Sequence, residues 1–177
     1  MSKFDLFNFI DANNLWSDEI HYPRNTFIKS PDTVDNRIYY IKAGSVKIGY
    51  YSSVGEEIVR LGYQGEIVVD LESFLTNEQS NLFIQTIQKT TLKCILKSDF
   101  IALTKSSHQN LELYNTLLEQ LVIDMLVREK DLLLLSPKDR FERFVRRSPL
   151  ALKYIPQKYI AQYLRMSPET LSRLVKY

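Results

Sequence analysis

Short segments rich in β-branched and aromatic residues fill the chain from about Glu19 to Lys97. Turn formers such as Pro31-Asp32 and Gly44 interrupt them at short intervals, and a short amphipathic helix is expected before them. The pattern predicts strands at TFIKS, RIYYIKAGSVKIGYYS, EEIVRLGY, LFIQTIQ and LKCILK. Many short strands without long helices between them are typical of an antiparallel sandwich or jelly roll.

From about Gln109 the apolar period changes to that of a helix. The segment NLELYNTLLEQLVIDMLVREKDLLLL lacks Gly and Pro, and its apolar residues form a seam that comprises Leu111, Tyr114, Leu118, Leu121, Met125 and Leu132. A helix of about 25 residues is some 37 Å long, more than a small β-domain needs for its own cover. Either the seam packs wholly on its own domain, or part of it pairs in parallel with a second copy; we favour the homodimer.

Ser136-Pro137 ends the long helix and begins another, with Ser136 as the N-cap and Pro137 in the first turn. The sequence therefore predicts an α+β protein with three parts. These are a β-domain over residues 1–107, a long helix over 108–135 and a helical module over 136–177.

The terminal stretch IPQKYIAQYLRMSPETLSRLVKY contains two helical patterns separated by a short turn. Ser167 is suited to cap the second helix and Pro168 to open it. The residues expected to form the shared core are Ile160, Ala161, Leu164, Met166, Leu171 and Leu174. The small side chain of Ala161 allows two helices to approach at a steep angle, as a helix-turn-helix requires.

The second of these helices has a polar face, which comprises Ser167, Pro168, Glu169, Thr170, Ser172, Arg173 and Lys176. Glu169 and Arg173 lie four residues apart, so both point to the same side of the helix. In a major groove, Glu can accept from a cytosine amino group and Arg can donate twice to guanine. Lys158, Arg165 and Lys176 suit phosphates. An ordinary helical hairpin also fits the spacing.

Charge is distributed unevenly along the 177 residues, although the net charge is only +2. Residues 1–135 contain 13 Lys and Arg against 18 Asp and Glu, a balance of −5, whereas residues 136–177 contain 10 against 3, a balance of +7. A basic module joined to an acidic body indicates a polyanionic partner for the module, such as double-stranded DNA.

Cysteine and histidine are too scarce for most cofactor sites. Cys94 is the single cysteine and is expected in the core, and the two histidines, His21 and His108, are far apart. We therefore expect no metal and no cofactor. The absence of nucleophile and phosphate-loop motifs argues against an enzyme. No signal peptide and no run of 18 apolar residues is found, so we expect a cytoplasmic protein without a membrane segment.

The order of strands, seam helix and terminal helix pair resembles the Crp/Fnr family of bacterial transcription regulators. The motif SPETLSR is similar to the recognition-helix pattern of that family. The resemblance implies that Glu169 and Arg173 read bases and that Ser167 and Thr170 contact phosphates. Two residues depart from the family pattern: Pro168 stands where many members have Arg, and Arg165 where Gly is common. The β-hairpin wing that follows in many relatives is not part of this sequence.

The resemblance also locates the cyclic nucleotide cassette of the family. Its Gly-Glu pair aligns with Val69 and Asp70, and its Arg-Ser pair with Ser80 and Asn81. The phosphate-binding arginine is thus missing, and no Lys or Arg occurs between Arg60 and Lys89. Because a buried phosphate needs a cation or several donors, we predict weak or no binding of cyclic AMP. Two interpretations of Asp70 are open: it holds a sugar-like hydroxyl, or, as we favour, it is an acid on a surface turn.

The function we predict is a homodimeric DNA-binding transcription regulator that reads a pseudo-palindromic operator. Its expected partners are double-stranded DNA and a second copy; an unidentified small-molecule effector and RNA polymerase are further candidates. The alternative is an effector-binding or protein-docking module of the same fold that does not bind DNA by itself.

Overall fold

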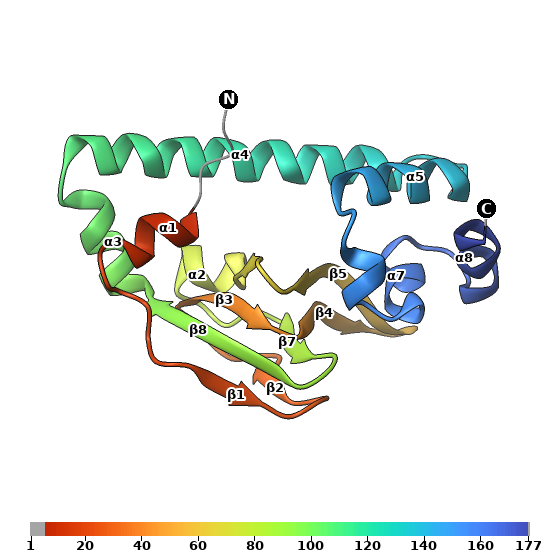
Figure 1. Ribbon diagram of the computed structural model, residues 1–177, viewed down its shortest axis with the longest axis horizontal. Coiled ribbons are helices and arrows are strands. Elements are labelled where there is room, and N and C mark those ends of the chain that lie inside the picture. The colour runs from red at the N-terminus through yellow and green to blue at the C-terminus, as the bar shows by residue number, and fades with distance from the viewer. Residues whose placement is uncertain (1–5, 177) are drawn as a thin grey trace.

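The computed structural model describes residues 6–176, which form a β-domain, a long helix and a group of short helices. Figure 1 shows the long helix across the top of the β-domain and the C-terminal helices gathered at its far end. The long helix, α4, spans His108–Leu132, and the next helix, α5, spans Pro137–Arg147. The predicted divisions after residues 107 and 135 therefore fall beside the starts of these two helices.

Two four-stranded antiparallel sheets make up the β-domain. Their strand orders are β1-β8-β3-β6 and β2-β7-β4-β5. The strands are β1 (Ile20–Tyr22), β2 (Phe27–Lys29), β3 (Arg37–Ala43), β4 (Ser45–Ser52), β5 (Gly55–Tyr63), β6 (Ile67–Val68), β7 (Phe83–Thr86) and β8 (Thr90–Leu96). The predicted jelly roll is confirmed. The sequence pattern did not predict β1 and β6, which are three and two residues long.

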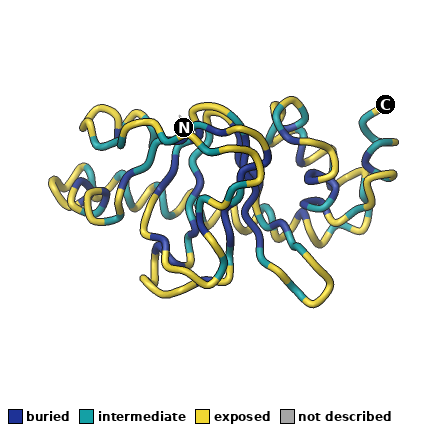
Figure 2. The backbone as a smooth tube through the Cα atoms, turned by 90° about the horizontal axis from the view of Figure 1, so that it is seen from below, coloured by how far each residue is buried: buried dark blue, intermediate teal, exposed yellow. Residues whose placement is uncertain are grey.

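The core of the β-domain lies between the two sheets. In β3, Tyr39 and Ile41 are buried, and β4 contributes Val46 and Ile48 to the same apolar cluster. Figure 2 shows buried backbone concentrated in the strands and exposed backbone in the turns that connect them. Burying each such side chain contributes about 1.5–3 kcal/mol, and these contacts hold the sheets together.

Gly44 makes the tight connection between β3 and β4. Its φ is +92°, and a Cβ at this position would lie 2.5 Å from the carbonyl oxygen of Lys89. Only glycine fits both the backbone conformation and the space. The turn predicted at this residue is thus fixed by local sterics.

Three short helices cover the end of the β-domain beneath the start of α4. They are α1 (Leu6–Asp11), α2 (Leu71–Thr76) and α3 (Lys97–Lys105). The predicted N-terminal helix, about Phe4 to Asn13, contains α1, although Phe4 lies outside the described residues. Ile10, Phe74 and Phe100 form a buried cluster here, against which Tyr114 of α4 packs. The first half of α4 is thereby fixed to the β-domain.

The C-terminal helices pack on one another and on the β-domain. They are α5, α6 (Ala151–Tyr154), α7 (Gln157–Tyr163) and α8 (Pro168–Val175). A single apolar cluster joins Ile160 and Leu171 of these helices to Ile58 of β5. The rings of Tyr63 and Tyr154 also stack, with centroids 5.6 Å apart. Within residues 6–176, no helix combines the length and apolar character that crossing a membrane requires.

Candidate nucleic-acid interface and sensor pocket

The helices α7 and α8 are the two helices predicted in the terminal stretch, and a short turn joins them. The hydroxyl oxygen of Ser167 accepts from the backbone N–H of Thr170 at 3.2 Å, and Pro168 opens α8. Between the helices, Arg165 has a φ of +55°, the left-handed conformation that favours glycine. A glycine would adopt this conformation without strain, and Arg165 adopts it here.

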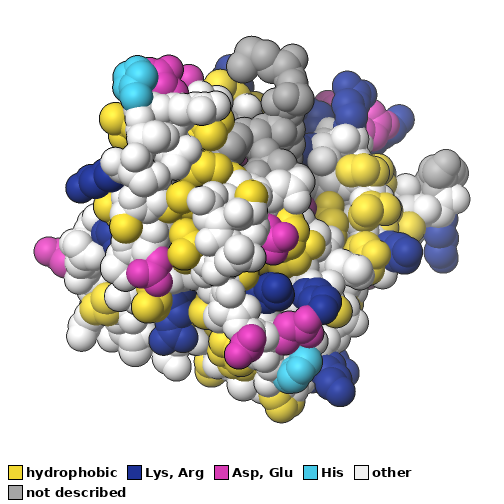
Figure 3. Space-filling view, turned by 60° about the vertical axis from the view of Figure 1, so that its left-hand side comes forward, with side chains coloured by type: hydrophobic (Ala, Val, Ile, Leu, Met, Phe, Trp, Pro, Cys, Tyr) yellow, Lys and Arg dark blue, Asp and Glu magenta, His cyan; other side chains and the backbone are white. Residues whose placement is uncertain are grey.

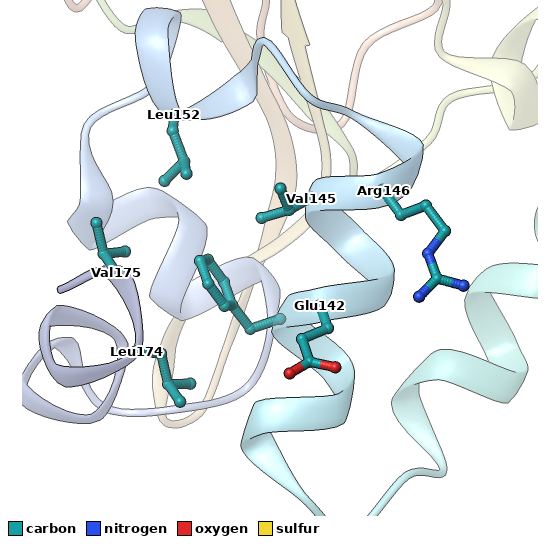
Figure 4. A pocket seen from close by; sticks show the side chains of 7 residues that line it. Glu142, Val145, Arg146, Leu152, Leu174 and Val175 are labelled. Atoms are coloured by element: carbon teal, nitrogen blue, oxygen red, sulfur yellow. The ribbon is translucent and has the colours of Figure 1, made fainter. Parts of the chain in front are cut away.

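Most of the residues predicted for the shared core of the helix pair are buried. Ile160, Ala161, Leu164 and Leu171 are buried, and Met166 and Leu174 are half-buried. Leu174 and Val175 face a groove whose other wall is α5, as Figure 4 shows with Glu142, Val145 and Arg146. The contact of α8 with α7 is thus close, whereas its contact with α5 leaves open space.

The polar side of α8 faces solvent. Ser167, Pro168, Glu169, Arg173 and Lys176 are exposed, and Thr170 and Ser172 are partly exposed. The pKa of Glu169 is lowered, first by a hydrogen bond to its own backbone N–H and then by the Ser167 hydroxyl. Glu169 is therefore a carboxylate at neutral pH, one helical turn from the guanidinium of Arg173. The helix presents an acceptor and a bidentate donor on one face, the groups that distinguish cytosine and guanine edges.

The two other predicted phosphate contacts lie beside this face in different surroundings. The Lys158 ammonium is 4.6 Å from the ring centroid of Tyr159 and is exposed. Arg165 is also exposed, but its Nη1 lies 2.9 Å from Oε2 of Glu57 on β5. The side-chain amide of Gln162 donates to the carbonyl of Glu56, next to this ion pair. The turn of the helix pair therefore contacts the β4–β5 hairpin of the β-domain.

Polar groups of the protein fill the predicted ligand pocket, and the interpretation of Asp70 as a surface acid is wrong. Asp70 is 0% exposed. Its Oδ1 accepts from the backbone N–H of Ser73 at 3.2 Å and caps α2, and the Ser80 hydroxyl donates to its Oδ2. Of the other predicted pocket residues, Val69 packs at the edge of an apolar cluster and Asn81 is exposed. The structure brings together only Asp70 and Ser80.

Lys29 supplies a cation to this pocket, which the sequence reasoning missed. Its Nζ is 2.9 Å from Oδ2 of Asp70 and donates to the hydroxyl and the carbonyl of Ser80, at 2.8 and 2.9 Å. Lys29 is 4% exposed, so the ion pair is shielded from water. It comes from β2, 51 residues before Ser80, and no local motif links the two segments. The pocket therefore contains a positive charge, which its own carboxylate neutralises.

A second buried carboxylate lies close to this pair. The Tyr39 hydroxyl donates to Oδ2 of Asp35 at 2.9 Å, and the backbone N–H of Asp35 donates to the Ser73 hydroxyl. Burial raises the pKa of Asp35 and that of Tyr39. On the surface of the β-domain end of the molecule, acidic and basic side chains are intermixed with apolar ones (Figure 3).

The predicted seam of α4 divides into an inner and an outer part. Leu111, Met125 and Leu132 are exposed, whereas Tyr114, Leu118 and Leu121 are half-buried. Tyr114 packs edge-on against Phe100, with centroids 5.9 Å apart, and so faces its own domain. Val122 and Leu126, which the sequence analysis did not include, add exposed apolar surface beside Met125. The outer part is an exposed stripe along the helix that comprises Leu111, Val122 and Met125, and the half-buried Leu118 borders it.

Comparisons with known proteins agree with this architecture. Residues 19–107, half of the chain, match a family described as the cyclic nucleotide-binding domain. FixK2 from Bradyrhizobium japonicum has 17% identity and a TM-score of 0.72, over 91% of this chain and 83% of that one. A CooA variant from Carboxydothermus hydrogenoformans has 16% identity and a TM-score of 0.69, over 99% of this chain and 84% of that one.

The catabolite activator protein from Thermus thermophilus is also similar, with 19% identity and a TM-score of 0.54, over 96% of this chain and 82% of that one. At these identities the likeness establishes the fold alone. Among curated proteins, none matches the sequence significantly.

Proposed function

The chain belongs to the cyclic nucleotide-binding domain family, and from this premise we propose that it is a DNA-binding transcription regulator of the Crp/Fnr type. The observation that carries the proposal is the solvent-facing polar side of α8, where Glu169 and Arg173 lie one turn apart. The Ser167 cap and the buried Leu171 hold this helix on α7. A helix supported in this way presents its first two turns to a major groove.

We propose further that the active species is a homodimer joined along α4. The exposed stripe of Leu111, Val122 and Met125, which the half-buried Leu118 borders, supports this, since an apolar helix face of this length is expected to be covered by a partner. Two copies joined in parallel would place two α8 helices on one side. The operator would then contain two half-sites about one turn of DNA apart.

For the β-domain we propose that cyclic AMP is not the effector, in spite of the family to which the chain belongs. The cation that could meet a phosphate, Lys29, is already paired with Asp70, and both are shielded from water. A ligand would have to break this ion pair before it gained any contact. Cyclic AMP at millimolar concentration is therefore expected to leave the melting temperature unchanged; a rise of several degrees would contradict this part of the proposal.

A salt titration tests DNA binding itself. The affinity for a duplex should fall steeply with salt, with a log-log slope near −0.9 for each phosphate that the protein neutralises. Weak association with every duplex and no salt dependence would favour the protein-docking module instead. Genome-wide mapping of bound sites would then supply the operator, its half-site spacing and the neighbouring genes.

A further inference from the structure

Arg140 is a buried arginine on α5 that belongs to none of the sites described above. It is 9% exposed, and its hydrogen-bond partners among residues 6–176 are four main-chain carbonyls. Nε donates to the carbonyl of Leu164 at 2.9 Å and Nη2 to that of Arg165 at 3.1 Å. Nη1 donates to the carbonyls of Leu134, at short range, and Leu135, at 3.3 Å.

The four carbonyls belong to two segments that are far apart in the sequence. Leu134 and Leu135 follow the end of α4, and Leu164 and Arg165 follow the end of α7. Leu164 is the C-cap of α7 and the other three residues lie beyond the caps, so none of the four carbonyls is paired by a following turn of its helix. A planar guanidinium with five donors can serve both ends at once, whereas a lysine cannot. Arg140 therefore ties the end of the long helix to the turn that precedes α8.

This turn determines the direction of α8. The backbone N–H of Met166 donates to the carbonyl of Ala161 at 3.0 Å. This bond ends α7 with a single residue, Arg165, in the left-handed conformation. Ser167 caps α8 two residues later. A groove separates α8 from α5, so α8 is held on its other side by the buried Leu171 against α7 and at its start by this turn (Figure 4).

We propose that Arg140 is a positioning residue for DNA reading. Its guanidinium holds the turn at Leu164 and Arg165, and so the base-reading face of α8, in a fixed orientation relative to the end of α4. This inference rests on the proposed function, because it concerns how the same helix reaches its groove. Since Arg140 is buried, it acts through the turn and makes no contact with DNA itself.

The test compares two arginines of α5 that carry the same charge. Arg140→Gln removes the buried guanidinium, and Arg146→Gln removes an exposed one from the same helix. Dissociation constants are measured for the operator recovered by genome-wide mapping and for a random duplex of equal length, well below the melting temperature of each variant. Arg140→Lys, which retains the charge but not the planar fork, is measured alongside.

We expect Arg140→Gln to weaken operator binding by about 10- to 100-fold, the worth of roughly one base contact, and to weaken random-duplex binding by less than about threefold. Arg140→Lys should restore only part of the discrimination, and Arg146→Gln should change both duplexes alike. Equal losses on the two duplexes for Arg140→Gln would overturn the positioning role, because they would show a merely electrostatic or folding effect.

Hydrogen exchange separates this inference from the proposed function. In Arg140→Gln, the amide of Met166 should exchange at least about tenfold faster, while the amide of Ile48 in β4 stays protected. Unchanged exchange at Met166 overturns the positioning role even if the protein binds its operator. If the wild-type protein binds no duplex, the proposed function and the positioning role both fall, whatever the exchange rates are.

Discussion

The buried pair of Lys29 and Asp70 and the exposed pair of Glu169 and Arg173 each combine a cation with a carboxylate, in opposite surroundings. In the sensor pocket, Lys29 and Asp70 are almost completely removed from water and donate to or accept from groups of the protein. On α8, the Arg173 guanidinium makes one long contact, 3.5 Å to the carbonyl of Glu169, and is otherwise open to solvent. Donors that already make hydrogen bonds within the protein must break them before they can bind a partner. The Arg173 guanidinium, in contrast, is exposed to solvent and has one long hydrogen bond to break.

The resemblance to the Crp/Fnr family therefore supports a binding function for α8 more strongly than it supports cyclic nucleotide binding by the β-domain. A buried ion pair is expensive to break, because each charge would remain in a medium of low polarity. Water, by contrast, readily gives way to a base edge or a phosphate. The ion pair of Lys29 and Asp70 therefore contributes to the stability of the fold. The polar face of α8, in contrast, can bind a partner without breaking a buried ion pair.

The largest expected effect comes from breaking the buried pair. Asp70→Asn retains an acceptor for the cap of α2 but leaves the charge of Lys29 unpaired, so the free energy of unfolding should fall by about 3–5 kcal/mol. Urea denaturation followed by circular dichroism measures it. The control is Glu72→Gln, an exposed carboxylate on the same helix, which should change stability by less than about 0.5 kcal/mol. Equal values for the two variants would show that the buried pair does not support the fold.

A second prediction concerns the stripe that joins the two ends of the molecule. Met125 is 61% exposed, and Met125→Lys would bury two cations in the proposed dimer. The dimer dissociation constant should rise by about 100-fold, close to 3 kcal/mol, as measured by sedimentation equilibrium. Thr116→Lys is the matched control, since nine residues, or two and a half turns, place it on the opposite face of α4. A monomeric wild-type protein would contradict the proposed assembly.

The third prediction concerns the exposed pair of Glu169 and Arg173 on α8. Arg173→Ala should weaken operator binding by about 1–3 kcal/mol and relax the sequence preference, because a bidentate contact to guanine is lost. Lys158→Ala should weaken binding to all duplexes similarly, as expected for a phosphate contact. Fluorescence anisotropy with operator and random duplexes gives both values. Equal losses on the two duplexes for Arg173→Ala would remove Arg173 from the base-reading role.

Sequence reasoning succeeded where the structural signal is local. The caps at Ser136 and Ser167 and the turn at Gly44 are each determined by a few neighbouring residues, and all three are present. The pattern of apolar residues likewise placed the core of the helix pair, because helical spacing determines which side chains share a face.

It failed where segments distant in the chain determine the surroundings of a residue. Asp70 was assigned to the surface because nothing near it in the sequence reveals that Lys29 packs against it. Arg140 is similar, since one of its partners, Leu164, lies 24 residues away. Tyr114, which the apolar period placed in the α4 seam, likewise packs against Phe100 of its own domain. Period alone shows that a face is apolar and does not identify what covers it.

The smallest expected effect lies at the contact between the two regions, where Arg165 pairs with Glu57. If Arg165 contacts a phosphate, it must leave this carboxylate, so Glu57→Gln should strengthen binding to every duplex. Because Arg165 is about half exposed, an ion pair of this kind is worth only about 0.2–1 kcal/mol, or roughly 1.5- to 5-fold in affinity. Glu72→Gln removes the same charge far from the helix pair and controls for the change in net charge.

A double-mutant cycle isolates this contact from general electrostatics. In an Arg165→Ala background, Glu57→Gln should no longer strengthen DNA binding, because the arginine that it releases is gone. If the strengthening persists there, Glu57 acts on DNA through its own charge and the ion pair has no part in it. If it vanishes, the closed and open regions compete for one side chain, and DNA binding draws the turn of the helix pair away from the β4–β5 hairpin.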